Sequence, residues 1–311
     1  MRGNWGRLAA GGLALCWAQG AMACGAGDVT VSFSPTTVAV ASWSPFPNGS
    51  QMTAQTTVTV TRTGSSNIRS ARLMILDSEA TSPLRVGTLN GFPGPIYSLT
   101  GGNVFQSPTS STPTAGNSLP FTYTSNSNSN VQNATTTLTI PINTAGDDFT
   151  PGTYSQTTTY FVQCYNNSGS FVGGGSTGAG PTLNVTVPNL LQVITAGPQT
   201  INFGSFTTTT QSLAISLKST GAVNANVSTQ NGNQMVLTGA PSPVPTNSTI
   251  PYSMTFDGQN VPAAGVSLAN LARAGVGGGN KSLVLTLPAL PSGKLAGTYK
   301  DIITLTLTPG S

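Results

Sequence analysis

Side chains capable of chemistry are scarce in this sequence, and those present do not form a catalytic set. The chain has no histidine, which removes the Ser-His-Asp triad, the Cys-His dyad and the commonest metal ligand. None of its lysines stands at the Ser-x-x-Lys spacing. Asp147-Asp148 is the only adjacent carboxylate pair and Asp77 with Glu79 the only close one, whereas glycoside hydrolysis needs two carboxylates facing each other in a cleft. We therefore predict a protein that is not an enzyme and has no cofactor and no metal site.

Two segments resemble functional motifs, and both have a simpler interpretation. Asp147-Asp148 comes just before Pro151-Gly152, where a carboxylate is expected to cap a turn. Residues 275–282 are rich in glycine and contain Lys281, but Asn280 interrupts the phosphate-loop pattern, so we expect a hairpin loop there. Charged residues make up only 6% of the chain, which leaves no basic patch for nucleic acid.

The N-terminus has the order of parts of a secretory signal peptide. Arg2 and Arg7 supply a basic region, residues 8–18 form an apolar stretch after it, and Ala21-Met22-Ala23 forms a small-x-small cleavage site. We therefore predict a signal peptide over residues 1–23, secretion through the periplasm and a mature chain that starts at Cys24. A lipoprotein signal that acylates Cys24 is the alternative, although Ala21 stands where such signals usually have leucine.

The mature chain retains two cysteines, because Cys16 lies inside the signal peptide. In an oxidising compartment the direct inference is a disulfide between Cys24 and Cys164. In the chain-entropy model, a loop of this length stabilises the folded state by roughly 4–5 kcal/mol.

Alternation of apolar and polar residues is the dominant pattern, and no apolar stripe of helical period and length appears. The alternating segments are rich in Val, Ile, Thr and Tyr and are separated by Gly, Pro, Asn and Ser, which predicts an all-β protein built of sandwiches. Only residues 268–274 suggest a short helical turn. The predicted strands are residues 29–33, 56–61, 72–76, 136–140, 154–163, 183–187, 190–194, 213–217, 282–287 and 301–308.

The sequence also contains two copies of one pattern. The second copy is one strand short, because the first copy continues after its Gly-Thr-Tyr strand into residues 183–187 and the second does not. We therefore predict an N-terminal domain over residues 24–188 and a C-terminal domain over residues 189–311 that needs a strand from another chain. The matching pairs, in chain order, are Ala41-Ser42-Trp43 with Phe203-Gly204-Ser205-Phe206, Leu119-Pro120-Phe121 with Ile250-Pro251-Tyr252, Leu138-Thr139-Ile140-Pro141 with Leu285-Thr286-Leu287-Pro288, and Pro151-Gly152-Thr153-Tyr154 with Ala296-Gly297-Thr298-Tyr299.

These repeated segments resemble the spore coat protein U domain, the family that supplies the pilins of archaic chaperone–usher (Csu-type) pili. Gly297, Tyr299 and Asp301 lie in a segment similar to its closing motif, and residues 203–206 resemble its Phe-Gly-x-Tyr element. Gln156 stands in the first copy where the closing motif expects aspartate, so that copy has diverged.

The resemblance implies two immunoglobulin-like pilin sandwiches in tandem, with the second completed by donor-strand complementation. It also implies three protein partners, namely a periplasmic chaperone, an outer-membrane usher and the next pilin subunit, whose donor strand enters residues 189–311. Because Cys24 directly follows the predicted cleavage site, the mature chain has no N-terminal donor segment of its own. These features are similar to those of the two-domain tip adhesin of such pili, which mediates attachment and biofilm formation at the cell surface.

A proline-rich aromatic insertion in the first copy is the main candidate for contact with a hydrophobic or host surface. The alternative is that Ile96, Tyr97 and Phe105 cap the core, and we assign Trp43 and Phe46 to the core. The candidate surface-binding residues are Phe92, Pro93, Pro95, Ile96, Tyr97, Val104, Phe105 and, on a second loop, Phe171.

Two other classes of protein fit the same composition. One is a structural coat or matrix protein that assembles without adhesive specificity. The other is a secreted carbohydrate-binding module or hydrolase.

Overall fold

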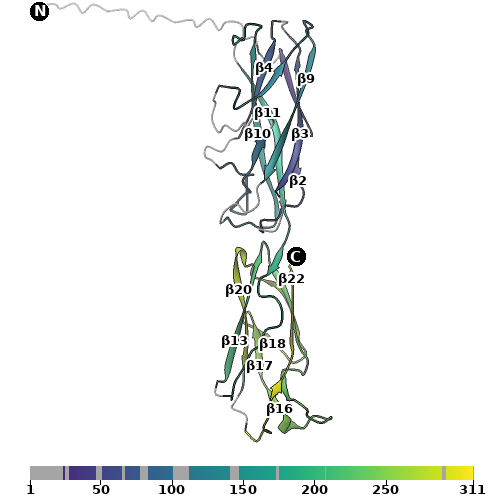
Figure 1. Cartoon of the computed structure of the whole chain (residues 1–311), viewed down its shortest axis with the longest axis vertical. Coiled ribbons are helices and arrows are strands. Elements are labelled where there is room, and N and C mark those ends of the chain that lie inside the picture. The colour runs from purple at the N-terminus through teal and green to yellow at the C-terminus, as the bar shows by residue number, and fades with distance from the viewer. Residues whose placement is uncertain are drawn as a thin grey trace, which may run out of the picture.

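The computed structural model describes residues 24, 28–46, 51–64, 67–77, 83–100, 112–140, 147–172, 175–206, 208–288 and 292–310. Within these ranges every regular element is a strand except η1 (Thr246–Ser248), a single turn of 3-10 helix. Two β-sandwiches stand end to end, and the C-terminus lies near their junction (Figure 1). The predicted signal peptide, Glu79, Val104 and Phe105 lie outside the described residues. No helix in the described part has the length and apolarity of a membrane span.

The first sandwich has two main sheets that enclose one hydrophobic core. Trp43 and Phe46 are buried, as predicted. One sheet has the order β1 (Val29–Ser34), β3 (Met52–Arg62), β9 (Asn130–Ile140) and β7 (Ser98–Thr100), and the other has β2 (Thr37–Val40), β11 (Ser176–Val187), β10 (Gly152–Tyr165), β4 (Ser70–Leu76) and β8 (Leu119–Thr122); β5 (Thr88–Leu89) and β6 (Phe92–Pro93) form a small ribbon.

The second sandwich has its own core and three sheets, of five, three and three strands. The first sheet has the order β12 (Leu191–Val193), β13 (Thr210–Ser219), β20 (Gly275–Thr286), β17 (Ser253–Phe256) and β18 (Gln259–Val261). The second has β19 (Val266–Leu271), β14 (Val223–Thr229) and β22 (Ile303–Pro309), and the third has β16 (Thr249–Pro251), β15 (Gln234–Leu237) and β21 (Tyr299–Lys300).

The alternation of apolar and polar side chains explains why these segments form strands. Along β3 the side chains of Val58, Val60 and Arg62 are buried, while the threonines between them face outward. The all-β prediction is confirmed, and all ten predicted segments lie in or overlap strands. Two expectations are wrong: residues 268–274 lie largely in β19 instead of a helical turn, and residues 275–282 belong to β20 instead of a loop. Both pair with neighbours in their sheets, and such pairing overrides local preference.

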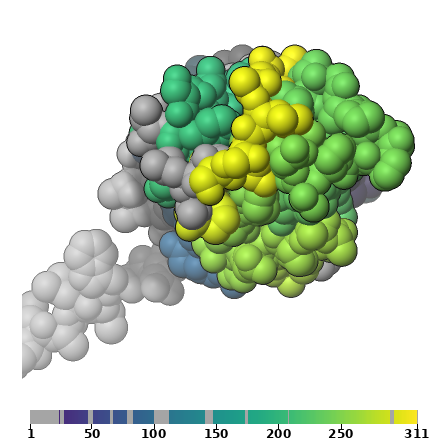
Figure 2. All heavy atoms as spheres, turned by 90° about the horizontal axis from the view of Figure 1, so that it is seen from below, coloured from purple at the N-terminus to yellow at the C-terminus, as the bar shows by residue number. Residues whose placement is uncertain are grey.

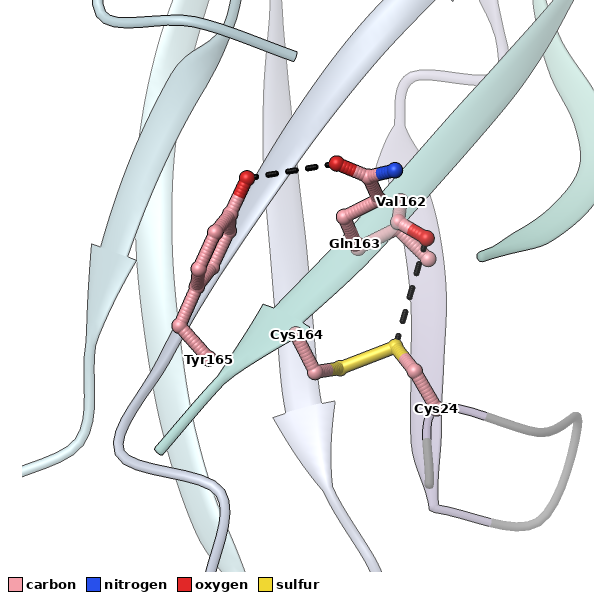
Figure 3. The surroundings of a disulfide bond; sticks show 5 residues. All are labelled: Cys24, Val162, Gln163, Cys164 and Tyr165. Atoms are coloured by element: carbon pink, nitrogen blue, oxygen red, sulfur yellow. Dashed lines mark hydrogen bonds between the residues drawn. A yellow bond between two sulfur atoms is a disulfide. The ribbon is translucent and has the colours of Figure 1, made fainter. Parts of the chain in front are cut away.

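The predicted disulfide between Cys24 and Cys164 is present (Figure 3), with an S–S distance of 2.08 Å. It fastens the chain before β1 to β10, on the sheet opposite the one that contains β1. The lipoprotein alternative needs the same sulfur of Cys24 for a thioether, so it does not fit this structure.

Each copy of the repeat has a glycine with a backbone conformation that other residues rarely adopt, at the start of β10 in the first copy and just before β21 in the second. Gly152 has φ +134° and Gly297 has φ +147°. In both copies a Cβ would lie 2.6 Å from a leucine methyl group, of Leu89 or Leu237 respectively. The tyrosine two residues later donates its hydroxyl proton to a carbonyl four residues back in each copy. This shared geometry explains why the Gly-Thr-Tyr segment recurs.

We predict that Gly152→Ala lowers the free energy of unfolding of the first sandwich by about 1–3 kcal/mol, because alanine is strained at this φ. Urea unfolding followed by the fluorescence of Trp43, the only tryptophan after residue 23, measures the change. Gly116→Ala is the control, since only Thr114 Oγ1, at 4.0 Å, is near its Cβ and its φ is not positive. Equal stability of the two variants would contradict the prediction.

Candidate functional site

The last strand of the second sandwich has an open edge. β22 pairs with β14 on one side and, among the described residues, with no strand on the other. Its counterpart in the first sandwich is β10, which pairs with β4 on one side and β11 on the other. In the described part of the chain, the second sandwich therefore has no strand that corresponds to β11, and the backbone groups on this edge of β22 have no ladder partner.

The missing strand leaves apolar side chains partly uncovered. Ile303, Leu305 and Leu307 pack against the core but remain partly exposed, whereas Tyr154 and Val162 on β10 are fully buried. Figure 2, seen from the end of the second sandwich, shows the yellow C-terminal segment at the surface beside the teal residues that precede β13. The open edge thus combines unpaired backbone with a partly exposed apolar strip, a combination typical of a strand-accepting site.

The first sandwich shows what the missing strand would look like. β11 runs antiparallel to β10 and parallel to β2, so it closes the sheet between them. It turns Leu183, Val185 and Val187 inward, and all three are buried. In the second sandwich, residues 196–206 occupy the chain position of β2 but form no ladder in the described structure.

The closing-motif residue Asp301 holds the start of β22 in place. Its carboxylate accepts hydrogen bonds from the amides of Asn231, at 3.1 Å, and Ile302, at 2.8 Å, and from the hydroxyl of Tyr252, at 2.7 Å. Burial and the bond to Asp301 both raise the pKa of Tyr252.

In the first sandwich the corresponding carboxylate comes from a different strand. Gln156, at the position of Asp301, donates to Asp77 Oδ1 at 2.7 Å, and the hydroxyl of Tyr97 donates to the other carboxylate oxygen. Both copies therefore have a carboxylate–tyrosine pair, but the carboxylate comes from just before β22 in the second copy and from the end of β4 in the first.

The end of the first sandwich that points away from the second, which we call the distal end, carries exposed apolar side chains. Phe171 is 51% exposed and Val131 is 55% exposed. The ring of Phe171 packs edge-on against Tyr165, with centroids 6.3 Å apart, and the turn before it is fixed by amides of Ser168 and Ser170 donating to Asn166. The contact with Tyr165 and the turn thus fix Phe171, and half of its side chain remains exposed.

A fully buried arginine organises the loops at the distal end. Arg62 donates to the carbonyl of Ile68, at 2.7 Å, in the β3–β4 loop and to those of Ser125, also at 2.7 Å, and Ser127 in the β8–β9 loop. Its guanidinium also lies 5.3 Å from the ring centre of Tyr123. Sequence reasoning missed Arg62, although the period-2 pattern of Val58 and Val60 places it on the inward face.

The structure corrects the predicted surface-binding insertion. Pro95 and Tyr97 are buried, so the surface prediction is wrong for them, and core packing is the right alternative for Tyr97. Ile96 is partly buried, and its backbone forms an isolated antiparallel β-bridge with that of Arg85. Phe92 and Pro93 are partly exposed but lie at the end that faces the second sandwich, where Arg273 stacks on Phe92. Val104 and Phe105 lie outside the described residues, which leaves Phe171 as the exposed candidate.

The adjacent carboxylates form ion pairs, and Asp148 also accepts the backbone amide of Phe149 at 3.0 Å. Asp147 pairs with Arg85, at 2.7 Å, inside the first sandwich, and Asp148 pairs with Arg273, at 2.5 Å, from the second. Among the described residues, no three His, Cys, Asp or Glu side chains gather as a metal site.

Comparison with known proteins gives distant structural similarity only. No protein-family profile and no curated sequence matches the chain. The chaperone-bound tip adhesion subunit of archaic Csu pili from Acinetobacter baumannii is 15% identical, with a TM-score of 0.38 over 89% of this chain and 99% of that one. The CFA/I adhesin of enterotoxigenic Escherichia coli is 14% identical, with a TM-score of 0.37 over 88% of this chain and 93% of that one. A tip adhesin of Pseudomonas aeruginosa is 10% identical, with a TM-score of 0.33 over 90% of this chain and 95% of that one. Similarity at this level does not assign a function.

The Arg62–Tyr123 pair predicts a specific alkaline titration. Burial raises the pKa of Tyr123 to about 12, although the charge of Arg62 acts to lower it. An unfolded tyrosine ionises near pH 10, so this contribution to stability is complete below about pH 10 and is lost as the pH rises to about 12. We expect Tyr123→Phe to remove one ionisation step near pH 12 from the absorbance titration at 295 nm. A titration identical to that of the wild type would contradict this assignment.

Proposed function

We propose that this protein is the tip adhesin of an archaic chaperone–usher pilus, completed by a donor strand from the next subunit. Its second sandwich accepts the strand at the open edge of β22, after a periplasmic chaperone has covered that edge and an outer-membrane usher has exchanged the two. Its first sandwich makes contact with hydrophobic or host surfaces, and this contact supports attachment and biofilm formation.

The open edge of β22 carries this proposal. Among the described residues, the second sandwich has no counterpart of β11 beside β22, and this absence leaves apolar side chains partly uncovered. A monomer that needs no partner protects its edge strands with charge, proline or a covering loop. β22 instead presents Ile303, Leu305 and Leu307 beside a backbone edge that pairs with no strand of the described residues.

The contact surface is best assigned to the distal end of the first sandwich. The opposite end is occupied by the second sandwich, so it is not free to meet a surface. Phe171 and Val131 supply exposed apolar area at the distal end, and the buried Arg62 fixes two of its loops. A rigid aromatic side chain on a held loop loses little conformational entropy when it binds.

The donor-strand part is tested by completing the second sandwich artificially. A copy of β11 (Ser176–Val187) is appended after Gly310 through a short flexible turn, because an antiparallel partner of β22 starts beside the C-terminus. We expect the mature chain without the copy to aggregate or to be degraded, and the completed chain to be a soluble monomer that unfolds cooperatively.

The matched control carries aspartate at the three appended positions that copy Leu183, Val185 and Val187. It keeps the length and backbone of the donor but cannot fill the apolar strip, so it should fail to rescue. Equal rescue by both appended strands, or a stable monomer with neither, would overturn donor-strand complementation here.

Adhesion tests the distal contact surface. Phe171→Ser combined with Val131→Ser should reduce the attachment of piliated cells to polystyrene several-fold, because each lost apolar contact is worth about 1 kcal/mol. Val244→Ser is the control, since Val244 is also exposed (45%) but lies in the second sandwich. Unchanged attachment at equal fibre display would favour a structural coat or matrix protein without adhesive specificity.

A further inference from the structure

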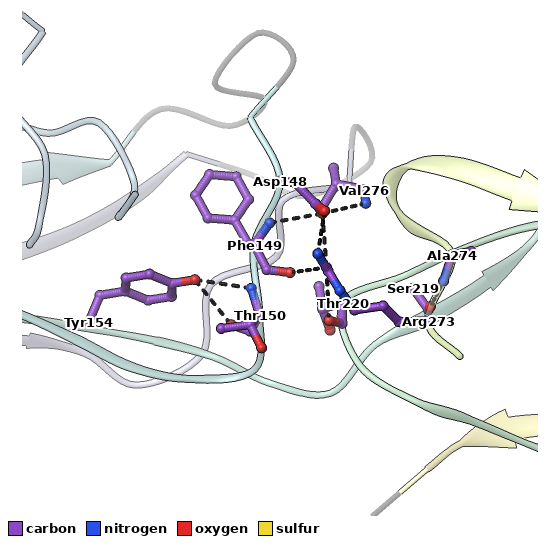
Figure 4. Close-up of polar contacts among 9 residues, drawn as sticks. All are labelled: Asp148, Phe149, Thr150, Tyr154, Ser219, Thr220, Arg273, Ala274 and Val276. Carbon is purple, nitrogen blue, oxygen red and sulfur yellow. Dashed lines mark hydrogen bonds and ion pairs between the residues drawn. The ribbon is translucent and has the colours of Figure 1, made fainter. Parts of the chain in front are cut away.

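The two sandwiches meet around a single arginine side chain. Arg273, between β19 and β20, donates to both carboxylate oxygens of Asp148, at 3.0 and 2.5 Å, and to the carbonyl of Phe149, at 3.0 Å (Figure 4). Its guanidinium also lies 4.4 Å from the ring centre of Phe92. The planar guanidinium thus binds both oxygens of one carboxylate, a carbonyl oxygen and an aromatic face. A lysine ammonium could not make this set of contacts.

The backbone beside Arg273 also fits closely against the first sandwich. The amide of Val276 donates to Asp148 Oδ1 at 3.0 Å, and the side chain of Val276 packs against the core of the first sandwich. A Cβ on Gly275 would lie 3.2 Å from the carboxylate of Asp148, and one on Gly221 would lie 2.8 Å from Pro151. Two glycines therefore permit an approach that larger residues would obstruct.

The carboxylate at this junction is held in its charged form. Burial acts to raise the pKa of Asp148, but the hydrogen bond from Arg273, the amides of Val276 and Phe149 and the charge of Arg273 together bring the pKa below its usual value. The junction is thus an ion pair with backbone support, unlike a flexible linker.

The same junction is hydrogen-bonded to the sheet that contains the open edge. Thr220 accepts a bond from the amide of Leu190, at 2.8 Å, and donates to the carbonyl of Pro188, also at 2.8 Å, which fixes the connection between the sandwiches. The side-chain amide of Asn189 donates to the carbonyl of Gly310, the residue after β22. Strands β19, β14 and β22 therefore all have one end at the junction.

We propose that Arg273 is a latch that holds the two sandwiches in one orientation and joins the first sandwich to the strand-accepting sheet of the second. The second half of this statement rests on the proposed function of β22. The Arg273 side chain is bound in the first sandwich by Asp148, by the ring of Phe92 and by the carbonyl of Phe149. The two sandwiches then keep one relative orientation. The insertion that contains Phe92 forms part of the junction and does not bind an outside surface.

Orientation is tested on the chain completed by the appended β11 copy. Spin labels on non-natural amino acids at Val131 and Val244, both exposed and both away from the junction, report the distance between the sandwiches. We expect one narrow distance distribution for the parent, and broad distributions for Arg273→Met and Asp148→Asn. Asp147→Asn is the matched control, because it makes the same chemical change one residue away and its partner Arg85 lies in the same sandwich.

The outcomes separate the latch from the proposed function. Narrow distributions in all variants, or broadening by Asp147→Asn equal to that by Asp148→Asn, would overturn the latch even if the donor strand completes the fold. If the appended strand does not complete the fold, donor-strand complementation fails, and the same labels on the chain without it still report the orientation.

The link to the open edge has its own readout. Hydrogen exchange of the β22 amides in the completed chain should be about fivefold or more faster in Arg273→Met than in Asp147→Asn, in line with ordinary coupling between sites. Broader distances with unchanged exchange would overturn the link while the latch remains. An unchanged melting temperature of the first sandwich shows that Arg273→Met still folds.

Discussion

The structure depends on one unfilled position, the place beside β22 where a further strand would complete the second sandwich. In the first sandwich β11 fills the equivalent place, and its inward residues Leu183 and Val185 are fully buried. In the second, Leu305 and Leu307 remain partly exposed and the backbone edge has no partner in the described residues. In the proposed function a strand from another chain completes this core, so the stability of the second sandwich depends on assembly.

Several of the few charged residues in the chain hold loops or the junction in place. Arg62 ties two distal loops through their carbonyls, and the ion pairs of Asp147 and Asp148 stabilise the junction end. Lys281, which is buried, pairs with Asp257 at 2.6 Å near the β17–β18 turn. The outer faces of the strands are left to threonine, serine and asparagine, whose hydroxyl and amide groups hydrogen-bond without long-range repulsion. Such a surface tolerates close packing against a neighbouring chain better than a highly charged one.

Local signals predicted the strands and the disulfide, because alternation and the cysteine count depend on neighbouring residues and compartment alone. The contact of Phe92 with Arg273 could not be predicted, because the two residues are far apart in the sequence. The direction of β4 gives a partial signal for the place of the insertion that contains Phe92. β4 runs toward the junction, so the segment that follows it begins at that end. The role of Asp148 had no such signal, since nothing local distinguishes it from Asp147, whose partner lies in the same sandwich.

The direction of the missing strand decides where the next subunit lies. β22 ends at the junction, where Gly310 meets Asn189, so an antiparallel donor equivalent to β11 begins there and ends beside Ile303. In the proposed function the donor is an N-terminal extension, and the body of the donating subunit follows its last residue. That body therefore lies beyond the far end of the second sandwich, in line with the two sandwiches (Figure 1). A parallel donor would place the body against the junction, where the first sandwich already stands. The antiparallel arrangement thus leaves the distal end, with Phe171, as the part farthest from the fibre.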